Sequence, residues 1–300
     1  MLTDLPIESL RDRSLLLRSL PAFAPLEDDT LSLLAEHVRL RRFRAGEVLL
    51  SIGEPIHHVY IILEGSVRWG RKGQELGSVA GQYQVVGWIS SMAREPDGIS
   101  AVVEEPAVVV ELPTDVLELT LEVDFALVRN LLRMGANALA SMRGDLPITP
   151  AAAPPLDLGV RRERRRTMVE RLIDMRSVPL FRRGNIEAVI ELTRRTVDIE
   201  VQPGHVFWER GALAPYWVVI EYGHVRCENA GGVTVDVGGN FVIGIMDALA
   251  QRPRSYSARA ESLVIGNRID LAAFLAVLEN HFDLARDFLA FLSRAVLDGG

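Results

Sequence analysis

Two kinds of hydrophobic pattern alternate along the chain. Short β-branched runs broken by a glycine, at residues 59–68 and 217–226, are typical of strands that bend, and residues 101–113 form a strand-like run that ends at Pro113. Apolar residues return at helical spacing in 114–139 and 270–296, where Asp115 and Asp270 are expected to cap the helices or lie in their first turns. The pattern predicts an α+β fold, an antiparallel roll or jelly roll flanked by helices.

The same order of segments occurs twice, in a nearly constant register. Three glycines and an arginine recur 158 positions later, as Gly46, Gly53, Gly65 and Arg68 and then as Gly204, Gly211, Gly223 and Arg226. Further matches lie on both sides, Pro21 and Phe23 with Pro179 and Phe181, and, at 157 positions, Glu122, Phe125 and Arg129 with Glu279, Phe282 and Arg286. A register held over a hundred residues predicts an internal duplication.

The duplication predicts two domains. The segment between the halves carries four prolines in residues 145–159, which discourage regular structure. We therefore expect a first domain at 1–144, a Pro/Ala-rich linker at 145–160 and a second domain at 161–300. The arginines within 161–166 are interpreted as the solvated face of a helix, with a patch for nucleic acid or an acidic partner as the alternative.

Composition narrows the class of protein. A hydrophobic share of 48% with 24% charged residues is typical of a globular chain that buries a sizeable core. The net charge of −7 provides no overall field to attract nucleic acid or an anionic membrane. A single cysteine, Cys227, excludes an internal disulfide and favours a reducing compartment. The acidic start and the lack of a long apolar run predict a cytoplasmic protein without a membrane span, and the arginine-rich, lysine-poor composition favours a bacterial source.

No catalytic or metal-binding motif stands out. The six histidines show no metal-ligand spacing with one another or with Cys227, and no nucleophile elbow, P-loop or dinucleotide fingerprint occurs. We therefore predict a protein that is not an enzyme, with no catalytic residues, no metal and no obligatory cofactor.

The glycine spacing resembles that of a known family. Glycine, six residues, glycine, eleven residues, glycine occurs in both halves and is similar to the cyclic nucleotide-binding domain family, the catabolite-activator-like β roll. The resemblance implies two tandem double-stranded β-helix (jelly-roll) domains with flanking helices, over roughly 15–142 and 168–297. A cupin-like jelly roll is the alternative. Family members carry a phosphate-binding cassette of an aromatic residue, Gly, Glu, an apolar turn and Pro-Arg, in which Glu holds the ribose and Arg the phosphate.

The second half retains part of that cassette. Gly244 matches the glycine, Ile245 stands where the ribose glutamate is expected, and Arg254 follows a proline as the phosphate arginine does. The resemblance implies a cAMP or cGMP site made by Gly244, Ile245, Arg254 and Ser255. A different anion, or a nucleotide that needs no ribose contact, is an alternative ligand. In a simpler interpretation, Arg254 is a solvated turn residue in an ion pair with Asp247 or Glu261.

The first half departs further from the family. Gly87 matches the glycine, but Trp88 replaces the glutamate and Asp97 replaces the arginine. Replacing the arginine by an aspartate removes a favourable contact with the phosphate and adds a repulsive one. Together these changes cost on the order of several kcal/mol of binding free energy. We therefore predict a degenerate first cassette that binds no nucleotide, and hypothesise that Trp88 turns inward and fills the nucleotide's space.

Two functions remain open at this level. The first is a regulatory or scaffolding protein that acts through protein partners, with a homodimer among the options. The alternative is a cyclic mononucleotide sensor with one working pocket in the second domain. Transcription factors of this family carry a helix-turn-helix after the last helix, and kinase regulatory subunits carry an inhibitor sequence before the first roll. Neither is expected here, so no DNA-binding domain is predicted.

Overall fold

A computed structural model describes residues 9–71, 77–93, 99–143, 146–147, 167–178, 181–182 and 184–299. Almost all of the predicted linker at 145–160, the arginines of 161–166 and Asp97 lie outside these residues. The chain divides into two compact units: Met1–Leu131 with Leu289–Asp298 and Gly300, and Leu132–Phe288 with Gly299. The domain bounds predicted from the sequence, 1–144 and 161–300, stay a prediction.

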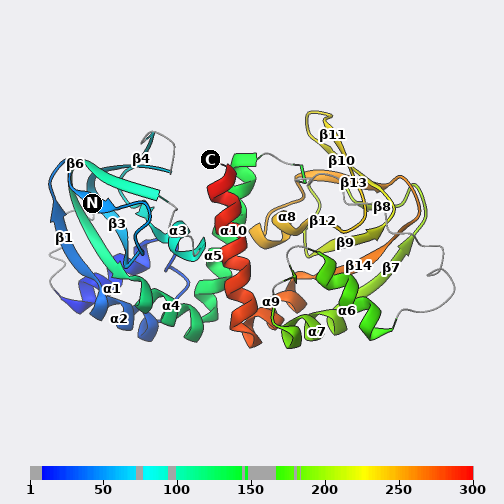
Figure 1. Ribbon diagram of the computed structural model, residues 1–300, viewed down its shortest axis with the longest axis horizontal. Helices are drawn as coiled ribbons and strands as arrows, with labels where there is room; N and C mark the ends of the chain where they lie inside the picture. Colours follow the sequence, from blue (N-terminus) through cyan, green and yellow to red (C-terminus); the bar gives the residue numbers. More distant parts are fainter. Residues whose placement is uncertain are drawn as a thin grey trace. The chain divides into compact units, whose positions relative to one another are not determined.

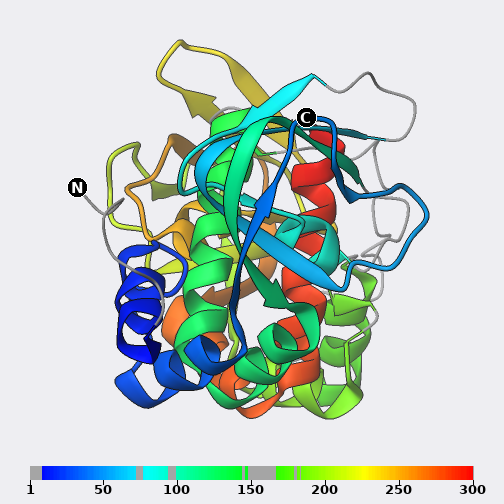
Figure 2. The same ribbon diagram turned by 90° about the vertical axis from the view of Figure 1, so that its left-hand side faces the viewer.

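The first unit contains one antiparallel sheet and the helices beside it (Figure 1). Its elements are α1 (Leu10–Ser19), α2 (Asp28–His37), β1 (Arg39–Phe43), β2 (Val48–Leu50), β3 (His58–Arg71), β4 (Ser78–Ala80), β5 (Val85–Val86), α3 (Trp88–Ala93), β6 (Ile99–Pro113), α4 (Thr114–Val123) and the start of α5 (Phe125–Arg143). The strand order is β1-β6-β3-β4, with β2 on β6 and β5 on β3. Figure 2 shows α1 and α2, in blue, at one end of this sheet.

The second unit repeats this order with two separate sheets. Its elements are α6 (Met168–Ser177), α7 (Ile186–Arg195), β7 (Val197–Val201), β8 (Val206–Trp208), β9 (Tyr216–Tyr222), β10 (Val225–Asn229), β11 (Thr234–Val237), β12 (Phe241–Ile243), α8 (Ile245–Ala250), β13 (Tyr256–Ala260), β14 (Val264–Asp270), α9 (Leu271–Asn280) and the start of α10 (Phe282–Gly299). One sheet has the order β11-β10-β13-β8, the other β12-β9-β14-β7. The expected mixture of antiparallel strands and helices in a β roll is confirmed.

The repeated glycines mark places where the backbone needs their freedom. Gly65 and Gly223 have φ angles of 79° and 91°, which only glycine adopts readily. A Cβ at Gly65 would lie 2.3 Å from the carbonyl oxygen of Pro106, and one at Gly223 would lie 2.1 Å from that of Leu263. In the first unit β3 continues through its glycine with bulges, whereas in the second the chain divides into β9 and β10.

The repeat extends to individual side-chain contacts. In each unit an arginine of the first helix donates to carbonyls at the end of the second helix, Arg13 to Ala35 and Val38, and Arg171 to Thr193 and Thr196. Donors at a helix C-terminus satisfy carbonyls that the helix leaves without partners. The recurrence of this contact at the same spacing supports the duplication inferred from the glycines.

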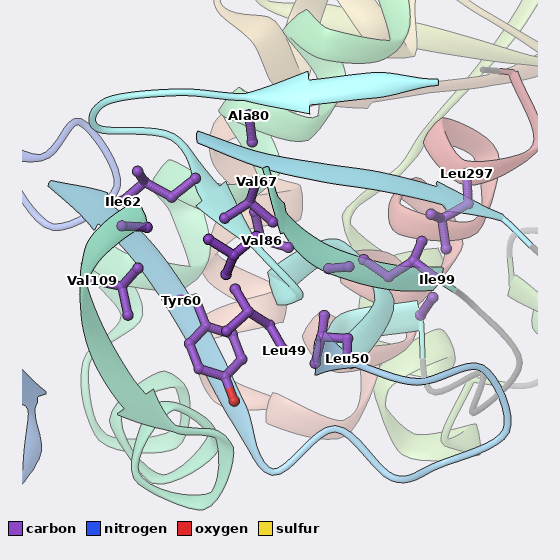
Figure 3. Packing of buried hydrophobic residues seen from close by; sticks show 14 residues of the cluster. Leu49, Leu50, Tyr60, Ile62, Val67, Ala80, Val86, Ile99, Val109 and Leu297 are labelled. Atoms are coloured by element: carbon purple, nitrogen blue, oxygen red, sulfur yellow. The ribbon is translucent and has the colours of Figure 1, made fainter. Parts of the chain in front are cut away.

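Each roll encloses its own apolar core. In the first, Ile62 and Val67 of β3 pack with Val86 of β5 and Val109 of β6 (Figure 3). In the second, the corresponding cluster includes Cys227, whose burial raises the pKa of its thiol to about 12. Within the described residues, no helix is long and apolar enough to cross a membrane, and no three His, Cys, Asp or Glu side chains are grouped to hold a metal.

Candidate functional site

The second cassette begins at a crowded glycine between β12 and α8. Gly244 has a φ of 82°, and a Cβ added there would lie 2.4 Å from an Nη1 of Arg254 and 2.8 Å from Cη2 of Trp208. Its N–H donates to the hydroxyl of Tyr256 at 2.7 Å. Only glycine fits this position, because both the backbone conformation and the neighbours exclude a side chain.

The helix that follows is short and buried on nearly every side. Five of the six residues of IMDALA are apolar, so α8 packs into the unit on nearly every side rather than along one stripe. Its buried residues are Ile245, Asp247, Ala248, Leu249 and Ala250. The helix ends at Gln251, which has a φ of 54° and donates its N–H back to the last turn. Ile245, at the position of the ribose glutamate, is 7% exposed and offers a ligand no polar group.

Arg254 points into the unit. It is 1% exposed, its Nη1 donates to the carbonyl of Gly244 at 2.8 Å, and its Nη2 donates to the carbonyl of Tyr216. Its guanidinium carbon lies 3.9 Å from the ring centroid of Trp208 and 5.2 Å from that of Tyr216. The interpretation of Arg254 as a solvated turn residue is therefore wrong.

The environment of Arg254 compensates only part of the cost of burying a charge. Desolvation lowers the pKa of its guanidinium, while Tyr256, Asp247 and Tyr216 act in the opposite direction. An arginine stays protonated even when it is buried. The two carbonyls and the face of Trp208 stabilise the resulting cation. The Nε of Arg254 is buried without a hydrogen-bond partner. The side chain is thus held in place by its two terminal nitrogens, while its Nε–H is unused.

Three aromatic residues surround this guanidinium. The Trp208 ring centroid is 5.9 Å from those of Tyr216 and Tyr256, and burial raises the pKa of Tyr256 well above its usual value. This aromatic group was not predicted from the sequence. The repeat register contains the signal, since the positions equivalent to Trp208, Tyr216 and Tyr256 in the first half are Leu50, His58 and Ile99. At these three positions the aromatic residues occur only in the half that contains Arg254.

Asp247 connects α8 to the residues just before β13. The carboxylate is 1% exposed, one oxygen accepts from Nε of Arg252 at 2.6 Å, and the other accepts from both the N–H and the hydroxyl of Ser255 at 3.0 Å. Ser255, expected from the resemblance to contact a ligand, therefore gives both of its donors to a side chain of the protein. Asp247 does not form the ion pair considered for Arg254, and Glu261 pairs instead with Arg226 at 3.5 Å.

The first cassette starts with the same bend but has different side chains. Gly87 has a φ of 94° and precedes α3, whose first residue, Trp88, is half-buried. Ile89 packs against the core of the first roll, and Trp88 is not among the described partly buried side chains that do so. Ser90 is 2% exposed and its hydroxyl has no hydrogen-bond partner. The hypothesis that Trp88 fills a nucleotide site stays a prediction.

A hollow of about 460 Å³ lies on the outer face of the β10–β13 sheet, apart from the cassette. Its lining includes Arg226, Arg259 and Glu209. Arg226 and Arg259 stand directly opposite each other on neighbouring strands, and Arg226 pairs with Asp236 and Glu261. The hollow is charged and exposed, and it was not predicted from the sequence.

A family model supports the resemblance for part of the chain. Residues 40–124 match the cyclic nucleotide-binding domain. The match covers β1 to the end of α4, including the first cassette, and confirms the family likeness inferred from the glycine spacing. No curated protein sequence matches the chain.

The solved structures that are similar to this chain share little sequence identity with it. The regulatory domain of Toxoplasma gondii PKA, in complex with cAMP, is 13% identical over 94% of this chain and 95% of its own, with a TM-score of 0.37. The regulatory subunit of a cAMP-independent protein kinase A from Trypanosoma brucei is 16% identical over 92% and 91%, with a TM-score of 0.35. A mutant of the cAMP-binding acyltransferase from Mycobacterium smegmatis is 26% identical over 36% and 34%, with a TM-score of 0.31.

Proposed function

We propose that this chain is a non-enzymatic regulatory or scaffolding protein with two tandem cyclic-nucleotide-binding-like domains. Neither cassette takes a cyclic nucleotide, and the protein acts by binding protein partners. The observation that carries this proposal is the inward position of Arg254, which is 1% exposed and bonded to the carbonyls of Gly244 and Tyr216.

The contacts of Arg254 oppose ligand binding energetically. A hydrogen bond that involves a charged group contributes about 1.5 to 3 kcal/mol, and a desolvated cation–π contact about 2 kcal/mol. Turning Arg254 toward a phosphate gives up two such hydrogen bonds and the stacking on Trp208, which together cost about 5 kcal/mol or more. Because about 1.4 kcal/mol corresponds to a factor of ten, this cost weakens nucleotide binding by more than a thousandfold.

The first domain is proposed to be unable to bind nucleotide on chemical grounds. Trp88 cannot accept from a ribose hydroxyl as a carboxylate does, and in the sequence the acidic Asp97 takes the position of the family's phosphate arginine. The hydroxyl of Ser90 is neutral and cannot replace the missing cation.

Exposed apolar side chains support a protein partner. Val169 and Ile173, one turn apart on α6, are 65% and 59% exposed, and Leu119 and Val123 on α4 are 52% and 64% exposed. Apolar residues at this spacing form a stripe along one side of a helix, a feature typical of surfaces that other proteins cover. A homodimer is one such arrangement.

The alternative function is a cyclic mononucleotide sensor that uses the second cassette, with cAMP or cGMP as ligand. One observation favours it: Nε of Arg254 and Nε1 of Trp208 are both buried without a hydrogen-bond partner. Buried donors without partners are costly, and a ligand that accepts from them would lower that cost.

A titration of the full chain with cAMP and cGMP separates the two functions. Calorimetry is combined with tryptophan emission, because Trp208 lies under Arg254 and any ligand that withdraws the guanidinium changes its environment. We expect no heat and no emission change up to about a hundredfold above micromolar concentrations. Micromolar binding at one site per chain, lost in Arg254→Ala, would overturn the proposal and establish the sensor. The variant Trp208→Phe identifies which emission change belongs to the cassette among the four tryptophans.

A further inference from the structure

We propose that the hollow on the outer face of the β10–β13 sheet binds a small zwitterion, either a free amino acid or a short peptide with charged ends. Glu228 holds the amine of this ligand, and Arg210 and Arg259 hold its carboxylate. The hollow lies on the side of the sheet that faces away from the core of the second roll. The inference therefore goes beyond the proposed function and does not depend on it.

The charges that line the hollow are balanced. They belong to three arginines and three glutamates: Arg210, Arg226, Arg259, Glu209, Glu228 and Glu261. A ligand with a single charge meets as many repulsive as attractive groups there, whereas a ligand with one charge of each sign is attracted at both of its ends. The volume of about 460 Å³ is in the range of sites for small molecules.

Two of these charges, one of each sign, are not paired. The side chains of Arg210 and Glu228 form no ion pair or hydrogen bond with another side chain in the part of the chain that the structure describes. Glu228 attracts Arg226 through space, but that arginine already pairs with Asp236 and Glu261. An unpaired cation and an unpaired anion in one hollow, too far apart to pair directly, leave room for a ligand that bridges them.

The two unpaired residues lie on either side of one strand. Glu228 of β10 stands opposite Ser257 of β13, and the N–H of Arg210, just after β8, donates to the hydroxyl of Ser257 at 3.0 Å. Because the strand order is β10-β13-β8, their backbones are separated by two strand spacings, about 10 Å. An extended dipeptide, with its amine and carboxylate about 7 Å apart, spans the space between side chains that reach in from these positions.

Arg259 supplies a second cation for the carboxylate. It stands directly opposite Arg226 on the neighbouring strand, and like charges in such a pair repel each other. Arg226 is compensated by Asp236 at 2.9 Å and by Glu261 at 3.5 Å. Among the described residues, Arg259 pairs only with Glu209, at 4.0 Å. A carboxylate beside Arg259 therefore offsets a repulsion that the protein itself compensates only weakly.

The first unit shows that the roll does not need these charges. At the three equivalent positions, Ile52, Gly70 and Val102 stand in place of Arg210, Glu228 and Arg259. The ion pair of Arg226 with Glu261, by contrast, recurs in the first unit as Arg68 with Glu104. The pair that both rolls share belongs to the fold, whereas the three charges that occur in one roll alone are available to a ligand.

Saturation-transfer NMR of the full chain with glycine and with glycylglycine tests the proposal. We expect at least one of these zwitterions to bind with a Kd on the order of 1 mM. Acetate and methylammonium each carry one of the two charges, so each should bind about fivefold more weakly or worse. The distance between the charges differs in glycine and glycylglycine, so the tighter binder shows whether the site takes an amino acid or a peptide.

Variants that remove one charge locate the ligand. Glu228→Gln and Arg210→Gln change exposed residues, so both should fold as the wild type does and bind the zwitterion about fivefold more weakly. Glu200→Gln is the matched control, because it removes an exposed glutamate from β7, a strand of the other sheet. It should bind the zwitterion as the wild type does.

The outcomes are distinct. Binding of a zwitterion that is weakened in both hollow variants and kept in Glu200→Gln supports the proposal. No transfer to either zwitterion at about 20 mM, equal binding of acetate, or unchanged binding in Glu228→Gln or Arg210→Gln overturns it. The proposed function fails on a separate result, the binding of cAMP or cGMP lost in Arg254→Ala.

Discussion

The cassettes of the two units share a backbone and differ in the side chains that the backbone brings together. Gly87 and Gly244 both turn the chain at positive φ, and each precedes a six-residue helix. Around Gly87 the nearest atoms are a methyl group of Leu50 and backbone of His58, whereas around Gly244 they belong to Arg254 and Trp208.

This difference shows that the second cassette is a coordinated set rather than one retained residue. Where the first half has Leu50 and Ile99, the second has Trp208 and Tyr256, whose rings contact each other beside the guanidinium. An arginine without that support would be a buried charge with little compensation. The set as a whole therefore stabilises Arg254 in its buried position.

The largest effect is expected from Arg254→Ala. The substitution removes the donors to two buried carbonyls and leaves a cavity beside Trp208, so we expect the second unit to lose about 3 kcal/mol or more in free energy of unfolding. Denaturant unfolding, followed by the emission of the buried Trp217, measures the loss.

Arg268→Ala is the matched control for that variant. Arg268 also stacks on Tyr216, at 4.3 Å, but its side chain is 44% exposed and pairs with Asp270. An exposed pair contributes about 1 kcal/mol or less, so this variant should change little. Equal losses in the two variants would show that Arg254 has no special role in the second core.

A smaller difference is expected between alanines at the two cassette glycines. Both Gly87→Ala and Gly244→Ala place a Cβ on a residue with positive φ, which costs about 1 to 2 kcal/mol. At Gly244 the new Cβ also meets the Trp208 ring at 2.8 Å, whereas at Gly87 the nearest atom is a movable methyl of Leu50 at 3.2 Å.

We therefore expect Gly244→Ala to cost about 2 to 3 kcal/mol in total, and Gly87→Ala only the backbone part. Unfolding of the two variants in denaturant gives the comparison. A larger loss at Gly87 would contradict the view that the second cassette is the more tightly packed of the two.

The smallest effect is expected at the junction of α9 and α10, where the free energy of unfolding should depend on pH. His281 lies between α9 and α10 and bonds Glu191 at 2.7 Å, which holds the pKa of the Glu191 carboxyl below its usual value. In the first unit Asp124 stands at the place of His281 and accepts from the hydroxyl of Thr30. The second junction is thus an acid–base pair, and the first depends on a neutral donor.

The sign of this dependence follows from the lowered pKa. A carboxyl with a depressed pKa in the folded state binds fewer protons than in the unfolded state, so its stabilisation is present above the unfolded pKa of about 4.3 and is lost as the pH falls through the folded pKa. The stability difference between the wild type and Glu191→Gln should shrink to nothing over that range. A difference that stays constant with pH would exclude the Glu191–His281 hydrogen bond as its cause.

Much of the fold was predictable because its signals are local. Gly65 and Gly223 sit at backbone positions that exclude other residues, so their spacing carries over from the sequence to the structure. Hydrophobic periodicity predicts helices over 114–139 and 270–296 in the same way, and the structure has α4 with α5 and α9 with α10 there.

The candidate site was less predictable, because burial depends on residues far apart in the chain. Pro-Arg at the end of an apolar segment indicates an anion site, yet the direction of the Arg254 side chain is set by Trp208 and Tyr216, which lie far earlier in the sequence. Likewise, Asp247 looks like an ordinary first-turn acid until its partner Ser255 is brought beside it.

The sequence by itself determined the glycine turns, and it predicts the duplication and a first cassette without the family's ribose and phosphate residues, since each of these is read from residue types at fixed spacing. Only the tertiary structure decided that Arg254 is enclosed by aromatic rings and that Asp247 takes the donors of Arg252 and Ser255. The physical reason is that a charged side chain goes where its charge is best compensated, and the carbonyls, rings and N–H groups that compensate it come together only when the chain folds.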